Sequence, residues 1–195
     1  MLLRKSGIWG TLAVAGLLVS GAAGAAISGS SHDFTGGGTV NLTAQGANTM
    51  CAACHTPHAG ARNLDNNDSP LWDRSASITT VWVAYTSDTM QHATGDPAGV
   101  SLLCMSCHDG VTALDSFGGP TGGTLIGGGF VRAPDMTNDH PISFTYDGAI
   151  AGDGGLVDTS TVAAAGVLDT AGDVQCSSCH DVHGDLDDTI GNGLP

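Results

Sequence analysis

The stretch Cys104-Met105-Ser106-Cys107-His108 decides how this chain is organised, because two other segments repeat its pattern. Cys51-Ala52-Ala53-Cys54-His55 lies upstream, and Cys176-Ser177-Ser178-Cys179-His180 lies near the end. Together the three segments use all 6 cysteines of the 195-residue chain. A histidine directly follows each cysteine pair, so one chemical requirement has to explain both the spacing and the histidine.

The pattern C-x-x-C-H is typical of covalent c-type haem attachment. Two thiols reach the two vinyl groups on one edge of a porphyrin, and the next residue turns its imidazole onto the iron. The sequence therefore predicts three covalent haem c groups. Their attachment residues would be Cys51, Cys54, Cys104, Cys107, Cys176 and Cys179, and their proximal iron ligands His55, His108 and His180.

Other uses of paired cysteines explain the pattern less well. A disulfide framework, zinc sites and thioredoxin-like redox sites all employ cysteine pairs. Zinc sites need pairs that converge in fours, and three pairs leave one unmatched. None of these alternatives accounts for a histidine after every pair.

The first 25 residues read as a secretory signal peptide. Arg4 and Lys5 provide the positive region, 8–19 is apolar, and Ala23-Gly24-Ala25 is a small-residue cleavage site. An uncleaved membrane anchor is the alternative interpretation. No second apolar segment is long enough to cross a bilayer. We expect an exported protein, periplasmic or at the cell surface, with one trihaem domain over 26–195.

The mature chain is strongly acidic. Without Arg4 and Lys5 it holds 3 arginines, no lysine and 19 aspartates, which gives a net charge of −16 with neutral histidines. Nucleic acid is excluded as a partner, since phosphate binding needs a basic surface. We expect other cytochromes or redox proteins, basic proteins, cations or mineral surfaces as partners.

The composition favours an irregular fold. The chain has 30 glycines, and Lys, Glu and Gln, which usually form surface helices, are scarce. We predict mostly loops around the three haems, with one-turn helices at the cysteine motifs and a few short strands. The strand candidates are Val40–Thr43, Ile78–Tyr85 and Ile142–Tyr146. The glycine-rich segment Gly118–Gly129 is predicted to be a flexible linker.

Five further histidines can fill the three remaining axial positions: His32, His58, His92, His140 and His183. Every iron can then be bis-histidine ligated. A residue three positions after the proximal histidine projects to nearly the same side of a helical turn. His58 and His183 therefore cannot ligate the haem of their own motif, but each can ligate a neighbouring one.

Chain distance suggests an assignment of these ligands. His32 can fold back over the first haem, and His140, in a turn fixed by Pro141, can close over the second. The third haem would take His58. His183 is then a surplus ligand, either spare or used at another haem, and His92 is predicted to be a surface residue.

Several segments, in order, resemble the multihaem c-type cytochromes of metal-reducing and related anaerobic bacteria. They are Ser31–Phe34, Cys51–His58, Pro70–Trp72, Ser101–Gly110, Asp139–Ile142 and Cys176–His183. The resemblance implies His32, His58 and His140 as distal ligands. Some members of this group polymerise into extracellular cytochrome filaments, and the best-known filament subunits carry four or more haems.

The resemblance implies an electron-transfer protein that is not an enzyme. One version is a repeating subunit of an extracellular filament, with histidine ligands that cross between subunits. The alternative is a soluble periplasmic electron shuttle or a subunit of a conduit. A multihaem reductase is a third interpretation, and it would require an open position on one iron.

Overall fold

Loops make up most of the described part of the chain, as the sequence predicts. The computed structural model describes residues 27–55, 71–72, 74, 79, 81–118, 122–152 and 154–183. The predicted signal peptide lies outside these residues. Within them, no helix is long and apolar enough to span a bilayer. The regular elements of this part are α1 (Gly99–His108), α2 (Gly148–Ala151), α3 (Thr159–Ala164), three short 3-10 helices, η1 (Thr43–Gln45), η2 (Gly128–Phe130) and η3 (Cys176–Ser178), and strands β1 (Phe144–Thr145) and β2 (Asp173–Val174).

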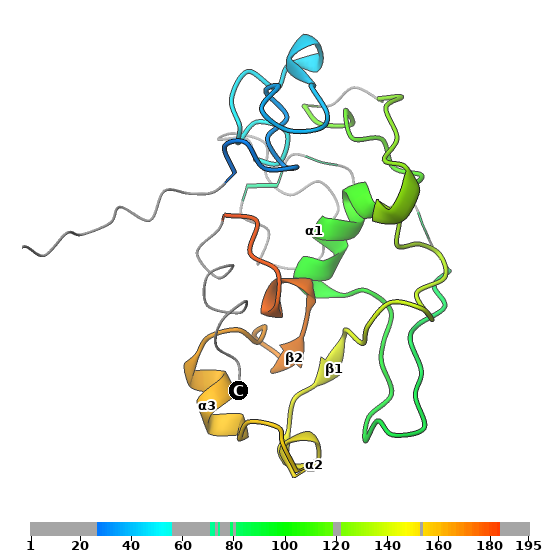
Figure 1. The fold of residues 1–195 in the computed structure, drawn as a ribbon, viewed down its shortest axis with the longest axis vertical. Coiled ribbons are helices and arrows are strands. Elements are labelled where there is room, and N and C mark those ends of the chain that lie inside the picture. Colours follow the sequence, from blue (N-terminus) through cyan, green and yellow to red (C-terminus); the bar gives the residue numbers. More distant parts are fainter. Residues whose placement is uncertain are drawn as a thin grey trace, which may run out of the picture.

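Helix α1 occupies the middle of the molecule (Figure 1). The N-terminal loops lie at one end of it, and β1, β2, α2 and α3 lie at the other. Leu102, Leu103 and Met105 of α1 are good helix formers, and His108 in the last turn suits the negative end of the helix dipole. The helix ends before Gly110, whose φ of +74° is left-handed. The middle motif thus sits in a ten-residue helix, longer than the one turn that we predict.

The two strands connect distant parts of the chain. β1 and β2 pair antiparallel, with Phe144 opposite Val174 and Thr145 opposite Asp173. The amide of Ser143 extends this contact by donating to the carbonyl of Val174 at 2.7 Å. The pairing lays the segment that follows His140 beside the segment that precedes Cys176.

The apolar core is small and lies at the C-terminal end of α1. Phe34, Leu42, Ala53, Leu114 and Phe117 are buried in one cluster, and the partly buried Cys107 packs against them. Residues of the first and second motifs thus share one core with the segment just after His32.

The structure corrects two predicted strands and adds a helix that we did not predict. Val40–Thr43 forms no strand: Asn41 makes one isolated bridge with Thr35, and a 3-10 helix begins at Thr43. In the described part of 78–85, the only bridge joins Val83 and Asp135. Helix α3 lies in a region without a helical apolar pattern, and the side chain of Asp158 caps it by accepting from the Thr161 amide.

The predicted glycine-rich linker is fastened where it is described. The amide of Thr124 donates to the carboxylate of Asp115 at 2.8 Å, and its carbonyl accepts from the Leu114 amide at 2.7 Å. The backbone groups of a loop near the core need such partners. The flexibility that we predict from composition therefore does not extend to this part of Gly118–Gly129.

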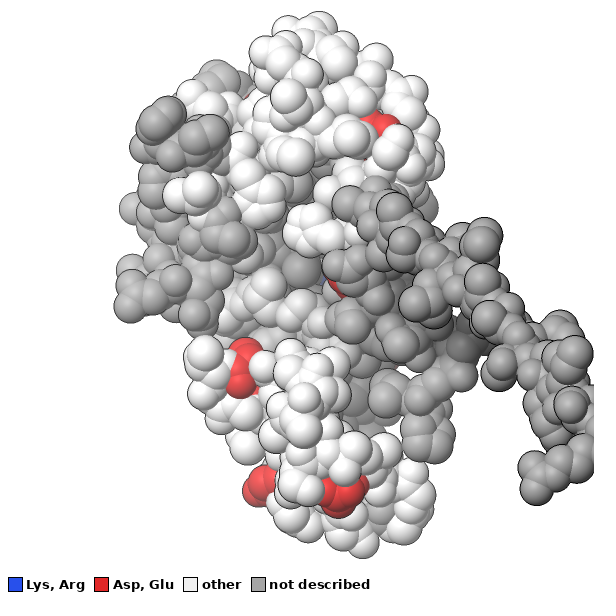
Figure 2. Space-filling view, turned by 90° about the vertical axis from the view of Figure 1, so that its left-hand side faces the viewer, with Lys and Arg blue, Asp and Glu red and all other residues white. Residues whose placement is uncertain are grey.

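On the face in Figure 2, the described residues show separate acidic groups and no basic patch. The two arginines that the structure describes explain this in part. Arg132 pairs with Asp139 at 2.9 Å, and Arg74 is completely buried.

Candidate functional site

The three cysteine motifs share a tight helical turn. The amide of His55 donates to the carbonyl of Cys51 at 2.8 Å, and that of His180 donates to Cys176 at 3.0 Å. The second motif forms the last turns of α1. Residues three and four apart lie on one side of such a turn, so each motif offers two thiols and one imidazole to the same space.

Each motif histidine faces a second histidine from a distant segment. The ring centres of His108 and His32 are 6.2 Å apart. Those of His180 and His140 are 6.0 Å apart. His55 and His183 stack at 6.2 Å, with 20° between the ring planes. The three pairs therefore have nearly the same separation.

This separation fits one metal ion between each pair of rings. A metal–imidazole nitrogen bond is about 2.0 Å long, and the ring centre lies about 1.1 Å beyond the nitrogen. Two imidazoles on opposite sides of one ion would thus have centres roughly 6 Å apart. Each pair provides two ligands, which suits a cofactor that brings the other donors itself, as a porphyrin does.

Hydrogen bonds and burial prepare some of these rings to ligate. His108 Nδ1 lies 2.8 Å from the carbonyl oxygen of Phe130, which can only accept. This contact places the proton on Nδ1 and leaves the lone pair of Nε2 for a metal. Burial, followed by the charge of His108, lowers the pKa of His32 and favours its neutral, ligating form. His183 Nδ1 lies 3.8 Å from the carboxylate of Asp181.

A cavity of about 520 Å³ lies beside the middle motif. Asp109 and Gly110 line it together with Val81, Val111 and Val131. It is open to solvent, and neither the thiols of Cys104 and Cys107 nor the ring of His108 lines it. It is therefore a depression beside the motif and is separate from the space between the paired histidine rings.

The order of the histidine pairs differs from our assignment. His32 faces the second motif and not the first, because its neighbour Phe34 is buried in the core that also holds Cys107. His140 faces the third motif and not the second, because the β1–β2 pairing carries it there. His183, predicted to be surplus, faces the first motif. His58, assigned to the third haem, lies outside the described residues.

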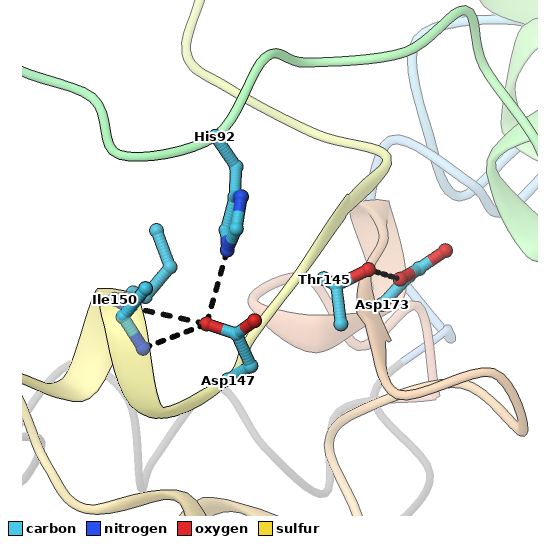
Figure 3. A network of polar contacts seen from close by, with 6 residues as sticks. His92, Thr145, Asp147, Ile150 and Asp173 are labelled. Carbon is cyan, nitrogen blue, oxygen red and sulfur yellow. Dashed lines mark hydrogen bonds and ion pairs between the residues drawn. The ribbon is translucent and has the colours of Figure 1, made fainter.

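His92 faces none of the motif histidines in the structure. Its Nε2 lies 3.0 Å from the carboxylate of Asp147, which also accepts from the amides of Ala149 and Ile150 at the start of α2 (Figure 3). The side chain is about one third exposed. His92 thus holds a loop onto α2, a role that its position in the sequence does not indicate.

The second and third motifs are joined by two neutral side chains, Ser101 and Gln175, here called the second junction. Ser101 Oγ donates to Gln175 Oε1 at 2.7 Å and accepts from the Cys176 amide at 3.0 Å. The two thiols hydrogen-bond to each other. In the chain without cofactor, this bond raises the pKa of Cys104 and lowers that of Cys176 to about 6.

The first and second motifs are joined by the guanidinium of Arg74, here called the first junction. It donates to the carbonyl oxygens of Ala53 and Ser106, which lie inside the two motifs. Sequence reasoning missed Arg74, Ser101 and Gln175. The only signal was that Arg74 is one of three arginines in a mature chain without lysine.

In comparison with known proteins, no family model matches the chain, and no curated protein gives a significant sequence match. The resemblance to multihaem cytochromes therefore stays a prediction from the motifs.

Proposed function

We propose that this protein is an exported trihaem c-type cytochrome that transfers electrons. The observation that carries the proposal is the set of three ring pairs, each joining the histidine of a C-x-x-C-H motif to a second histidine about 6 Å away. The six cysteines would hold the porphyrins. His108 with His32, His180 with His140 and His55 with His183 would bind the three irons.

A bound haem iron takes up and gives back one electron as it changes between Fe(III) and Fe(II). Two imidazoles on each iron leave no coordination position for a substrate, which supports electron transfer over catalysis. Phe130 would hold the His108 ring in the orientation that ligation requires. The two junctions keep the three motifs next to one another, as passage of an electron from haem to haem requires.

The ring pairs draw all their members from one chain. The proposal therefore needs no histidine from a second copy, and a carrier that works as a discrete molecule and docks on other redox proteins is one form of it. Self-association into filaments, with ligation across subunits, stays a prediction. Sedimentation at increasing concentration, together with electron microscopy of the secreted protein, distinguishes a discrete carrier from a fibre.

The test is to produce the full chain in a host that attaches haem c. The expected protein has a mass that corresponds to three haems and a spectrum that is entirely low-spin. His32→Ala, His140→Ala and His183→Ala should each make one haem of the three high-spin, since each removes one sixth ligand.

His92→Ala is the matched control and should leave all three haems low-spin, because Asp147 and not a motif histidine faces His92. If His58→Ala opens a haem and His183→Ala does not, the proposed partner of His55 is wrong. A protein without haem, or an unaltered protein with a high-spin haem, would contradict the proposed function itself.

A further inference from the structure

Arg74 is a cation in the interior of the protein. Its exposed fraction is 0%, and its guanidinium donates only to backbone carbonyl oxygens. The distances are 3.1 Å to Ala53, 2.5 Å to Leu114, 2.7 Å to Ala113 and 3.4 Å to Ser106. Its Nε has no hydrogen-bond partner. Among the ion pairs of the described residues, none involves Arg74.

A buried charge without a counter-ion is costly for a fold. Charge-assisted hydrogen bonds to four carbonyls offset part of this cost, but their dipoles do not cancel the net charge. A long apolar side chain could fill the same space without the desolvation cost. The charge therefore calls for a role besides packing.

The position of the guanidinium suggests that role. The Ala53 carbonyl lies between the two cysteines of the first motif, and the Ser106 carbonyl lies between those of the second. No hydrogen bond of Arg74 reaches the third motif.

We propose that Arg74 is a positioning and electrostatic residue that raises the reduction potentials of the first and second haems relative to the third. The inference rests on the proposed function. Reduction adds an electron to an iron, so a nearby fixed positive charge favours the reduced form, and it does so strongly where water is excluded. The charge would give the row of haems an uneven potential.

Two carboxylates act in the opposite direction. Asp109 lies near Cys107 and accepts from Val111 and Thr112, and Asp181 lies near His183. Both remain when Arg74 is replaced. The change in potential on substitution therefore reports on the charge of Arg74 alone.

The experiment compares three variants of the haem-loaded full chain. Arg74→Gln and Arg74→Met remove the charge, and Met is the kind of apolar replacement that buried ions tolerate. Arg74→Lys keeps the charge. The measurements are the number of haems by mass and the three potentials by redox titration. His140→Ala, which alters the ligand facing His180, identifies the potential of the third haem.

The expected result is a fall of two potentials in a neutral variant that keeps three haems. Each fall should correspond to about a tenfold change in the equilibrium constant of reduction, or ~59 mV for one electron. In the neutral variants, the potential of the third haem should change by less than half of that amount. In Arg74→Lys, all three potentials should change by less than half of that amount. Arg132→Gln is the matched control, because it removes an arginine charge that is exposed and paired with Asp139.

Four results would overturn the inference: unchanged potentials in a neutral three-haem variant, an equal fall of all three, the same fall in Arg74→Lys, or failure of both neutral variants to hold three haems. The last would make Arg74 a residue of the fold alone. An unaltered protein without haem would instead refute the proposed function, and the mass of that protein separates the two failures.

Discussion

The two junctions that meet at α1 do the same mechanical task with different chemistry. The first junction uses one buried charge, Arg74, which binds backbone carbonyls in the first two motifs. The second junction is neutral: Ser101 and Gln175 bind each other, and Ser101 also accepts from the amide of Cys176. Both fix one motif against the next, but only the first places a buried positive charge between them.

This difference separates stability from redox tuning. Hydrogen bonds of either kind hold the backbone in place, and their loss leaves buried groups without partners. A buried net charge also changes the free energy of an added electron, and by more than a neutral hydrogen-bonding group does. Damage to the second junction should therefore affect mainly folding, whereas neutralising the first should affect the potentials as well.

The largest effect is expected from the double substitution Cys104→Ser and Cys107→Ser. It removes the middle haem from the helix on which both junctions depend, and we expect loss of the compact fold. Cys51→Ser with Cys54→Ser is the control, and it should lose one haem but keep the second junction. Haem content by mass and far-UV circular dichroism measure the two outcomes. Equal damage from both pairs would argue against a central role for α1.

Gln175→Leu should weaken the second junction. Gln175 is 2% exposed, and its loss leaves Ser101 and Asp169 without a shared partner. Leaving such buried groups unpaired costs about 1–3 kcal/mol, which denaturant titration can measure. The exposed Gln45→Leu serves as the control.

The potentials of the Gln175→Leu protein sharpen the comparison of the junctions. Because the side-chain amide that is lost is neutral, the three reduction potentials should stay close to those of the unaltered protein. A fall as large as that expected for Arg74→Gln would show that the junctions do not differ in the way that we describe.

Gly110→Ala should disturb the ligand of the middle haem. The φ of Gly110 is +74°, and an added Cβ would lie 2.6 Å from Val131 Cγ1. Left-handed backbone in a residue other than glycine costs of order 1–3 kcal/mol. Movement of Val131 should also shift Phe130, which orients His108. We expect a lower unfolding midpoint and an altered absorption spectrum.

Gly129→Ala is the control for this substitution, because nothing lies within 4 Å of the Cβ that it would add. A normal spectrum in both variants would mean that the Phe130 contact does not control the orientation of the His108 ring.

The smallest effect is expected from Asp158→Ala, at the start of α3. Hydrogen bonds from Ser160 and Thr161 lower the pKa of this carboxyl. Because the pKa is lowered in the folded protein, the ionised Asp158 side chain stabilises α3 fully at pH values above about 4, the ordinary pKa of an aspartate. This stabilisation is lost as the pH falls through the lowered pKa. The substitution should loosen α3 at neutral pH without changing any potential. Amide NMR shifts of α3 measure this, with Asp88→Ala as the control, and shifts throughout the molecule would contradict it.

The composition was sufficient to predict the irregular fold, because so glycine-rich a chain has few means of forming long helices or sheets. The strand within Ile142–Tyr146 was also predicted, and the structure confirms its central residues as β1. Its partner β2 has only two residues. A segment that short has no periodicity, so neither the pairing nor its effect on His140 could be derived from the sequence.

The histidine partners were beyond sequence reasoning for a related reason. We matched each histidine to a motif by distance along the chain, which assumes that loops close locally. Phe34 instead joins the core beside Cys107 and takes His32 to the second motif. Arg74 was missed because a single arginine in a loop has no pattern, and only the packed structure shows that it is buried.

Both junctions attach to the same helix, and this has a consequence for how the gene can vary. Ser101 and Ser106 lie five residues apart in α1, which is about 7.5 Å along the helix axis. One inserted codon between them would turn the two attachment points by roughly 100° relative to each other. Insertions and deletions should therefore be tolerated in the long connections between the motifs, but not within these five residues.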